Sequence, residues 1–252
     1  MILHSVEAGA GRPVILLHGL FGSARNLGGV QRALAEHHRI IAMDARNHGA
    51  SPHAQGADYP TMAADTLETM EALNARPAVV IGHSMGGKTA MRLALDHPDA
   101  VTALCVADIA PVPNASRFHG YIAAMRALPE SATRAEADTA LASAVPDPGI
   151  RTFLLQNFRP GQTPPWRIGL KELADALPAI EGWESPDAQY DGPTLFISGD
   201  RSDYIKPDDR PVIRELFPRA RFVTLRNAGH WLHADNLSGF VGVLQAFLAR
   251  TA

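Results

Sequence analysis

The sequence contains little cysteine, no long apolar run and no excess of positive charge. Its single cysteine, Cys105, excludes an internal disulfide and a cysteine-based zinc cluster. No apolar run approaches the roughly 20 residues that a membrane-spanning helix needs. Lysine and arginine number 23 against 26 aspartates and glutamates, which disfavours a nucleic-acid partner. The first residues lack the basic and apolar regions of a secretion signal. These absences predict a cytoplasmic protein without stable membrane association.

Two further absences concern cofactors and metals. Gly9-Ala10-Gly11 does not extend to the G-x-G-x-x-G pattern, so no dinucleotide is indicated. The 11 histidines form no evident ligand cluster, and His230 with His233 would supply too few ligands for a zinc site. We therefore expect neither a cofactor nor a bound metal.

Short apolar runs alternate with amphipathic helical patterns over most of the 252 residues. The runs predict buried strands at 14–17, 40–43, 79–81, 104–107, 194–197 and 222–225. Apolar residues at helical spacing predict helices over 27–37, 61–74, 85–96 and 236–250. Strands that are apolar throughout indicate a sheet covered on both faces, and their alternation with helices indicates parallel pairing. The sequence predicts an α/β fold with a doubly wound, mostly parallel sheet.

The alternation stops between residues 113 and 182. Helical patterns are recognisable there at 117–127, 133–144, 150–157 and 169–177, separated by prolines that include Pro178. We interpret 113–182 as a helical cap inserted before the penultimate strand, on a core formed by 1–112 and 183–252. The alternative is that these helices simply cover the sheet. Eight apolar cap residues either line a substrate pocket or pack the cap onto the core: Phe118, Tyr121, Met125, Phe153, Leu154, Phe158, Trp166 and Leu170.

The candidate nucleophile is Ser84, which lies between a predicted strand and a predicted helix. It occupies the centre of Gly82-His83-Ser84-Met85-Gly86, a G-x-S-x-G pattern. A sharp strand-to-helix turn exposes a serine hydroxyl to a base, and small neighbours relieve the crowding that the turn creates. A glycine-rich turn with an uninvolved serine is the simpler interpretation, but the strand–turn–helix context favours a nucleophile.

The same segment also fits a phosphate-binding loop. Residues 82–89 match G-x-x-x-x-G-K-[ST], and the next predicted strand ends in Asp108, where a magnesium ligand would stand. A nucleotide binder would not need the other features described below, and two strand–helix units already precede this one. We therefore keep a P-loop nucleotide binder as a remote alternative.

Acyl transfer needs two amide donors for the oxyanion. The helix that begins after Ser84 offers the amide of Met85 first. The second donor belongs on a neighbouring loop, and His18-Gly19-Leu20-Phe21-Gly22 follows the first strong strand. The amide of Leu20 is our candidate, with Phe21 next. The alternative is an ordinary turn in which His18 is a packed core residue.

The base and the acid complete the constellation. His230 follows the last strand, and Gly229 allows its loop to turn toward Ser84, whereas His233 is expected to pack or cap. The base needs a carboxylate to fix its tautomer. Two strand ends supply candidates, Asp108 on one and Asp200 or Asp203 on the other. The residues alone leave this choice open.

At these motifs the chain resembles the α/β-hydrolase superfamily, and most closely the small bacterial esterases of the YbfF type and their mitochondrial relatives. The similar segments are 18–23, 44–52, 82–88 and 108–112, together with Trp166-Arg167. The resemblance implies Asp108 as the acid and Ser202 as an auxiliary group near His230. Asp203 stays the alternative acid, because this chain carries aspartates beside Ser202. In segment 44–52 we expect Arg46 and Asn47 to brace loops and Gly49 to turn the chain, none of them taking part in the chemistry.

The predicted activity is serine-dependent cleavage of carboxylic esters with short to medium acyl chains, through an acyl-enzyme intermediate. The expected partner is a small acyl ester, and the sequence does not indicate an oligomeric state. An acyl thioesterase or a C–C bond hydrolase would use the same three residues. A non-catalytic binding protein of this fold is a further alternative, although such proteins typically lose one of the three.

Overall fold

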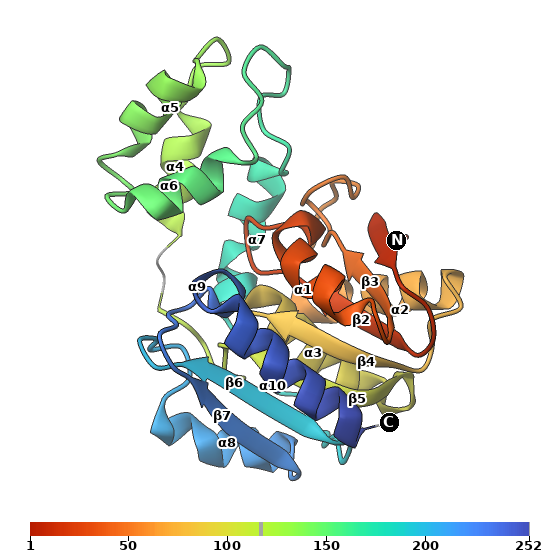
Figure 1. The fold of residues 1–252 in the computed structure, drawn as a ribbon. Helices are drawn as coiled ribbons and strands as arrows, with labels where there is room; N and C mark the ends of the chain where they lie inside the picture. Colours follow the sequence, from red (N-terminus) through yellow and green to blue (C-terminus); the bar gives the residue numbers. More distant parts are fainter. Residues whose placement is uncertain (116–117, 252) are drawn as a thin grey trace.

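The computed structural model describes residues 1–115 and 118–251 (Figure 1). Residue 117, the first of the helix expected over 117–127, lies outside the described residues, as does 116 within the expected cap. A seven-stranded sheet forms the centre, in the order β1-β3-β2-β4-β5-β6-β7. β1 runs antiparallel to β3, and every other neighbouring pair is parallel. The strands are β1 Ser5–Ala8, β2 Pro13–Leu17, β3 Arg39–Met43, β4 Ala78–His83, β5 Val101–Ala107, β6 Thr194–Gly199 and β7 Ala220–Leu225.

Helices cover both faces of this sheet, so the predicted doubly wound α/β fold is confirmed (Figure 1). One layer holds α2 (Tyr59–Ala72), α3 (Met85–Asp96) and α8 (Arg210–Leu216). The opposite layer holds α1 (Gly28–Leu34) and α10 (Leu237–Arg250). The short helical elements are η1 Ala24–Leu27, η2 Pro98–Ala100, η3 Pro207–Asp209 and α9 Leu232–Asp235. In the described part of the chain, no helix has both the length and the apolar character required to span a membrane.

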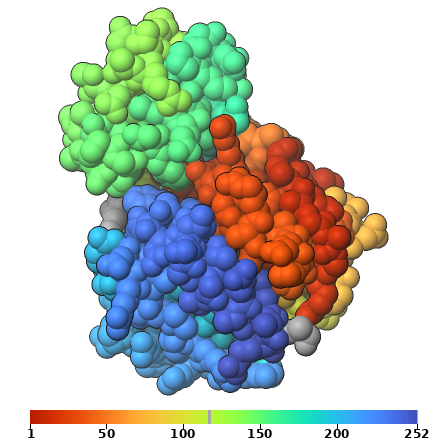
Figure 2. Space-filling model, in the orientation of Figure 1, coloured from red at the N-terminus to blue at the C-terminus, as the bar shows by residue number. Residues whose placement is uncertain are grey.

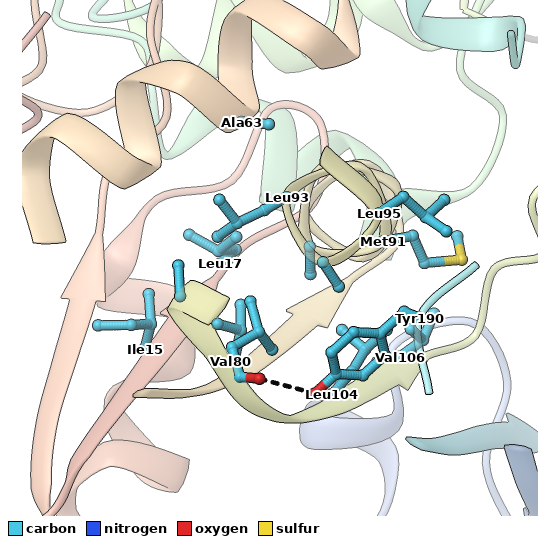
Figure 3. Packing of buried hydrophobic residues seen from close by; sticks show 14 of the residues in the cluster. Ile15, Leu17, Ala63, Val80, Met91, Leu93, Leu95, Leu104, Val106 and Tyr190 are labelled. Atoms are coloured by element: carbon cyan, nitrogen blue, oxygen red, sulfur yellow. Dashed lines mark hydrogen bonds between the residues drawn. The ribbon is translucent and has the colours of Figure 1, made fainter. Parts of the chain in front are cut away.

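The core is divided into two layers because successive strand residues point to opposite faces of the sheet. On one face Val80 and Leu104 pack against Met91 and Leu93 of α3 (Figure 3). The residues that alternate with them belong to the layer under α1 and α10. This two-sided burial explains why the central strands are continuous apolar runs, and all six strands predicted from such runs are present.

The sequence did not predict the edge strand β1. Its residues Ser5–Ala8 are exposed or half-buried, because β1 lies at the edge of the described sheet and pairs there with β3 alone. A strand at the sheet edge has no need of a continuous apolar run. The signal that identified the inner strands was therefore missing.

Four helices lie between β5 and β6 in the described part of the segment predicted to be a cap. They are α4 His119–Arg126, α5 Arg134–Leu141, α6 Pro148–Leu155 and α7 Leu170–Glu181. Together they form a lobe above the core, shown in green in Figure 2. The lobe has its own apolar cluster, which continues into the core through Leu20, Phe21 and Met85.

The expectation that Pro178 ends the last cap helix was wrong. Helix α7 passes through Pro178 and continues to Glu181. Proline removes one backbone bond, the one that residue 178 would donate to residue 174, but its own carbonyl still accepts from Gly182 N at 3.0 Å, so the helix closes beyond it. The additional turn buries Ile180, which helps to hold the lobe on the core.

Lys88 joins the core to both connections of the lobe. It lies on α3 and is only 1% exposed. Its Nζ donates to Asn114 Oδ1 at 2.6 Å, where the chain enters the lobe, and to Gly182 O at 2.8 Å, where the chain leaves. Asn114 N also donates to Glu181 O at 2.7 Å, so the two connections are fastened to each other as well.

The buried amine makes stability depend on pH. Burial lowers the pKa of Lys88 from 10.5 to about 7, an effect that the nearby Glu181 carboxylate partly offsets. Between these pKa values the unfolded chain binds a proton that the folded chain lacks, so stability rises with pH. We expect the wild type to gain about 3 kcal/mol relative to Lys88→Met between about pH 7 and about pH 10. Urea unfolding of both proteins across this range measures the difference, and parallel stability curves would contradict it.

Candidate active site

Ser84 lies on a strained turn between β4 and α3. Its backbone is in the left-handed region, with φ 53° and ψ −119°, which is unusual for a residue with a side chain. The turn is possible because Gly82 and Gly86 leave room for it. A Cβ on Gly82 would lie 2.1 Å from Gly86 O, and a Cβ on Gly86 would lie 2.5 Å from Leu17 O. These contacts explain the small residues that the sequence pattern places around the serine.

A continuous line of hydrogen bonds joins Ser84, His230 and Asp108. His230 Nε2 lies 2.9 Å from Ser84 Oγ, and His230 Nδ1 lies 2.8 Å from Asp108 Oδ2. The carboxylate only accepts, so Nδ1 carries the proton and Nε2 presents a lone pair to the hydroxyl. The ring of Tyr204 stacks on the imidazole at a centroid distance of 3.8 Å. This arrangement allows His230 to remove the proton of Ser84.

Asp108 is completely buried, yet its carboxylate has several donors. Gly199 N donates to Oδ1 at 3.0 Å, and both Ser202 Oγ and His230 Nδ1 donate to Oδ2. These bonds compensate for the water that a buried carboxylate loses. The resemblance implied that Ser202 lies near His230. In the structure Ser202 bonds to the carboxylate of Asp108, which in turn bonds to the imidazole.

The other two carboxylates considered as the acid are placed differently. Asp200 accepts bonds from Asn227 N and Ala228 N, at 3.0 and 3.1 Å, and these bonds lower its pKa. It therefore braces the loop that carries His230. Asp203 lies in the wall of the cavity beside Ser84. The imidazole Nδ1 points at Asp108.

Two backbone amides near Ser84, one in the Leu20 loop and one at the start of α3, are available for a new hydrogen bond. Neither Leu20 N nor Met85 N has a hydrogen-bond partner within residues 1–115 and 118–251. Gly19 brings the Leu20 loop against the nucleophile, since a Cβ on Gly19 would lie 3.1 Å from Ser84 Cβ. Phe21 N, the second candidate, instead donates to His48 Nε2 at 3.1 Å. Unpaired amides at a nucleophile are suited to binding an oxyanion.

His83, for which no role was predicted, supports the loop of the base. Its Nε2 donates to the backbone carbonyl of His230 at 2.7 Å, which fixes the loop that carries the base. Burial and the neighbouring His230 and His233 hold the pKa of His83 well below its usual value, so the ring is neutral. His233 packs edge-on against His83, with ring centroids 4.9 Å apart. The position of His83 inside the G-x-S-x-G pattern was the only available signal.

The residues that a P-loop would direct at phosphate make other contacts. Lys88 Nζ is bonded to Asn114 and Gly182, at the base of the lobe. Thr89 Oγ1 donates to Met85 O at 3.0 Å within its own helix, and Asp108 is bonded to His230. The geometry therefore gives no support to the nucleotide-binding interpretation.

A cavity of about 270 Å³ opens beside Ser84, between the core and the lobe. Of the eight apolar residues considered for a pocket, Phe118, Tyr121, Phe153 and Leu154 line it, and Ile150 joins them. The remaining four, Met125, Phe158, Trp166 and Leu170, are buried in the cluster of the lobe. Helical spacing alone could not separate these two groups, because short helices carry apolar residues on more than one face.

Known proteins are similar to this chain in both sequence and structure. The family model described as "alpha/beta hydrolase fold" matches residues 12–149. The sn-1-specific diacylglycerol lipase ABHD11 of Mus musculus is 42% identical, covering 94% of this chain and 80% of the mouse protein. Esterase YbfF of Escherichia coli is 40% identical, covering 94% and 92% of the two chains. A solved structure titled marine microorganism esterase has a TM-score of 0.93 at 36% identity, covering 98% and 99%.

Proposed function

Because this chain belongs to the α/β-hydrolase family, we propose that Ser84, His230 and Asp108 carry out its carboxylic ester hydrolysis. The observation that supports this assignment is the unbroken chain of bonds, at 2.9 and 2.8 Å, from the hydroxyl through the imidazole to the buried carboxylate. The relatives named as esterases and as a lipase support the same reaction class.

The first half of the reaction forms an acyl-enzyme. Ser84 Oγ attacks the ester carbonyl carbon while His230 Nε2 takes the hydroxyl proton. The carbonyl oxygen becomes an oxyanion, which the amides of Leu20 and Met85 bind. Asp108 stabilises the imidazolium. The carbon–oxygen bond to the alcohol then breaks, and His230 gives its proton to the departing alkoxide.

The second half returns the enzyme to its starting state. A water molecule enters in place of the alcohol, and His230 Nε2 takes one of its protons. The hydroxide attacks the acyl carbon, and the same two amides bind the second oxyanion. Breaking the bond to Ser84 Oγ releases the carboxylic acid, and His230 returns the proton to the serine.

We propose short to medium acyl esters as substrates. The cavity of about 270 Å³ is small beside the roughly 300–1,000 Å³ of pockets for drug-sized ligands, and apolar side chains form most of its outer wall. Phe153 lines both this cavity and a neighbouring one, and its ring packs 5.9 Å from the ring of Trp231. From the sequence we also propose a cytoplasmic location and a small-molecule partner.

A series of p-nitrophenyl esters from acetate to palmitate tests the substrate proposal. We expect the highest kcat/KM for a chain no longer than octanoate and a decline beyond it, because longer chains leave the apolar wall. Phe153→Ala should move the optimum to longer chains by removing a side chain of that wall. Each methylene that gains an apolar contact improves kcat/KM by roughly 10-fold.

The control is Leu177→Val, a change in the lobe away from the cavity, which should leave the optimum in place. An optimum at palmitate in the wild type would contradict the proposed chain length. Diacylglycerol belongs in the same panel, because the mouse relative is named for that substrate. If no ester is cleaved, thioesters and C–C substrates of the same acyl groups are the next assays.

A further inference from the structure

Two buried histidines, His18 and His48, are not used by the proposed reaction. They are 2% and 0% exposed and lie on the loops that follow β2 and β3. Their rings meet edge to face, with centroids 5.1 Å apart. From the sequence, His18 was a possible core residue and His48 had no predicted role.

Each imidazole has one nitrogen facing a carbonyl oxygen and one facing an amide. His18 Nδ1 lies 2.7 Å from Gly19 O, and His48 Nδ1 lies 2.9 Å from Arg46 O. Ala45 N donates to His18 Nε2 at 3.0 Å, and Phe21 N donates to His48 Nε2 at 3.1 Å. A carbonyl only accepts and an amide only donates, so both rings are neutral, with the proton on Nδ1.

The two rings therefore fasten two loops reciprocally. His18 comes from the loop after β2 and binds an amide of the loop after β3, while His48 does the reverse. Burial lowers the pKa of both, that of His48 to about 3, so the neutral form that this arrangement needs persists at ordinary pH.

These bonds fix the peptide units on both sides of Leu20. Gly19 O accepts from His18 Nδ1 and from Gly22 N at 3.0 Å. In a trans peptide the carbonyl and the following amide point in opposite directions, so the Leu20 N–H points away from these two donors. The next peptide is held by His48 at Phe21 N, and Phe21 O accepts from Asn157 Nδ2 of the lobe at 2.8 Å.

Phe21 needs such support because its φ is 63°, a left-handed conformation that a bulky residue rarely adopts. We propose that His48, together with His18, is a positioning residue that aims the Leu20 amide at the oxyanion formed on Ser84. The proposal rests on the proposed function. It implies that loss of the bond to Phe21 N lets the Leu20 amide turn away, which affects the transition state more than substrate binding.

Two variants of His48 with similar size separate this role from simple packing. Glutamine extends an amide oxygen that can accept from Phe21 N, whereas methionine has comparable length and no strong acceptor. We expect His48→Met to lower kcat on p-nitrophenyl butyrate by about 10- to 100-fold, with KM within about twofold. His48→Gln should keep kcat within a few-fold of the wild type. Thermal unfolding monitored by circular dichroism verifies that both variants are folded.

A folded His48→Met variant with the wild-type kcat overturns the proposal, as does an equal loss of kcat in the two variants. If His48→Met does not fold, Asn157→Leu tests the inference instead. This variant removes the hydrogen bond that Asn157 Nδ2 donates to Phe21 O. It should lower kcat severalfold without raising KM, and an unchanged kcat contradicts the inference. The activity of the wild type distinguishes failure of the proposed function from failure of this inference. A wild type without esterase activity refutes the proposed function, whereas an active wild type with active variants refutes only this inference.

Discussion

Replacing Ser84 by alanine is expected to lower kcat for ester hydrolysis by about 10⁴- to 10⁶-fold, because it removes the oxygen that forms the acyl-enzyme. The hydroxyl lies 2.9 Å from the imidazole that would take its proton, on a turn that holds it clear of the backbone. KM should change little. Steady-state hydrolysis of p-nitrophenyl butyrate measures the loss.

Ser202→Ala is the matched control, because Ser202 is the other serine of the site. Its hydroxyl donates to Asp108, so its loss leaves Gly199 N and His230 Nδ1 on the carboxylate. We expect a decrease in kcat of about 10-fold or less, the effect of one lost hydrogen bond to a charged group. A larger loss for Ser202→Ala than for Ser84→Ala would show that the nucleophile is misassigned.

Asp108→Asn should lower kcat by about 10³- to 10⁴-fold, because an amide does not hold His230 in the tautomer that presents a lone pair to Ser84. Asp108 accepts from three donors, so the NH₂ of asparagine fits beside Oδ2's partners only if Ser202 Oγ or His230 Nδ1 accepts instead of donating. Some loss of stability should accompany the change. Activity is therefore measured at a temperature at which circular dichroism shows the variant folded.

Asp203→Asn supplies the comparison, since both aspartates follow strands that end at the same edge of the sheet. We expect its kcat to stay within about 10-fold of the wild type, because the Nδ1 of His230 is bonded to Asp108. The reverse order of effects would identify Asp203 as the acid.

The inner part of the fold was predictable from the sequence because burial on both faces requires apolar residues at successive positions. The edge strand β1 and the helix α8 lie where one side is exposed, and their mixed composition gave no such signal. At Pro178 a signal was present but misleading, because the helix was expected to end before this residue. A residue that usually ends a helix here removes a single backbone bond, and α7 continues beyond it to Glu181.

The reacting groups were predictable because each has a local signature. Ser84 lies in a strand–turn–helix pattern, and His230 follows the last strand. The residues that hold these reacting groups in place have no local signature in the sequence. Whether His83 donates to the carbonyl of His230, or Lys88 to Asn114, depends on segments more than 20 residues apart coming together. The sequence could not decide between Asp108 and Asp203 for the same reason. The decision depends on which carboxylate the Nδ1 of His230 contacts in the folded chain.

Covalent labelling with a fluorophosphonate, followed by mass spectrometry of the digested protein, tests the central claim most directly. The probe phosphonylates only a serine that a neighbouring base activates, and it does not depend on knowing the natural ester. We expect one label per chain, on the peptide that carries Ser84, and none on Ser84→Ala. A label on another residue, or an unlabelled protein that still hydrolyses esters, would contradict the claim that Ser84 is the nucleophile.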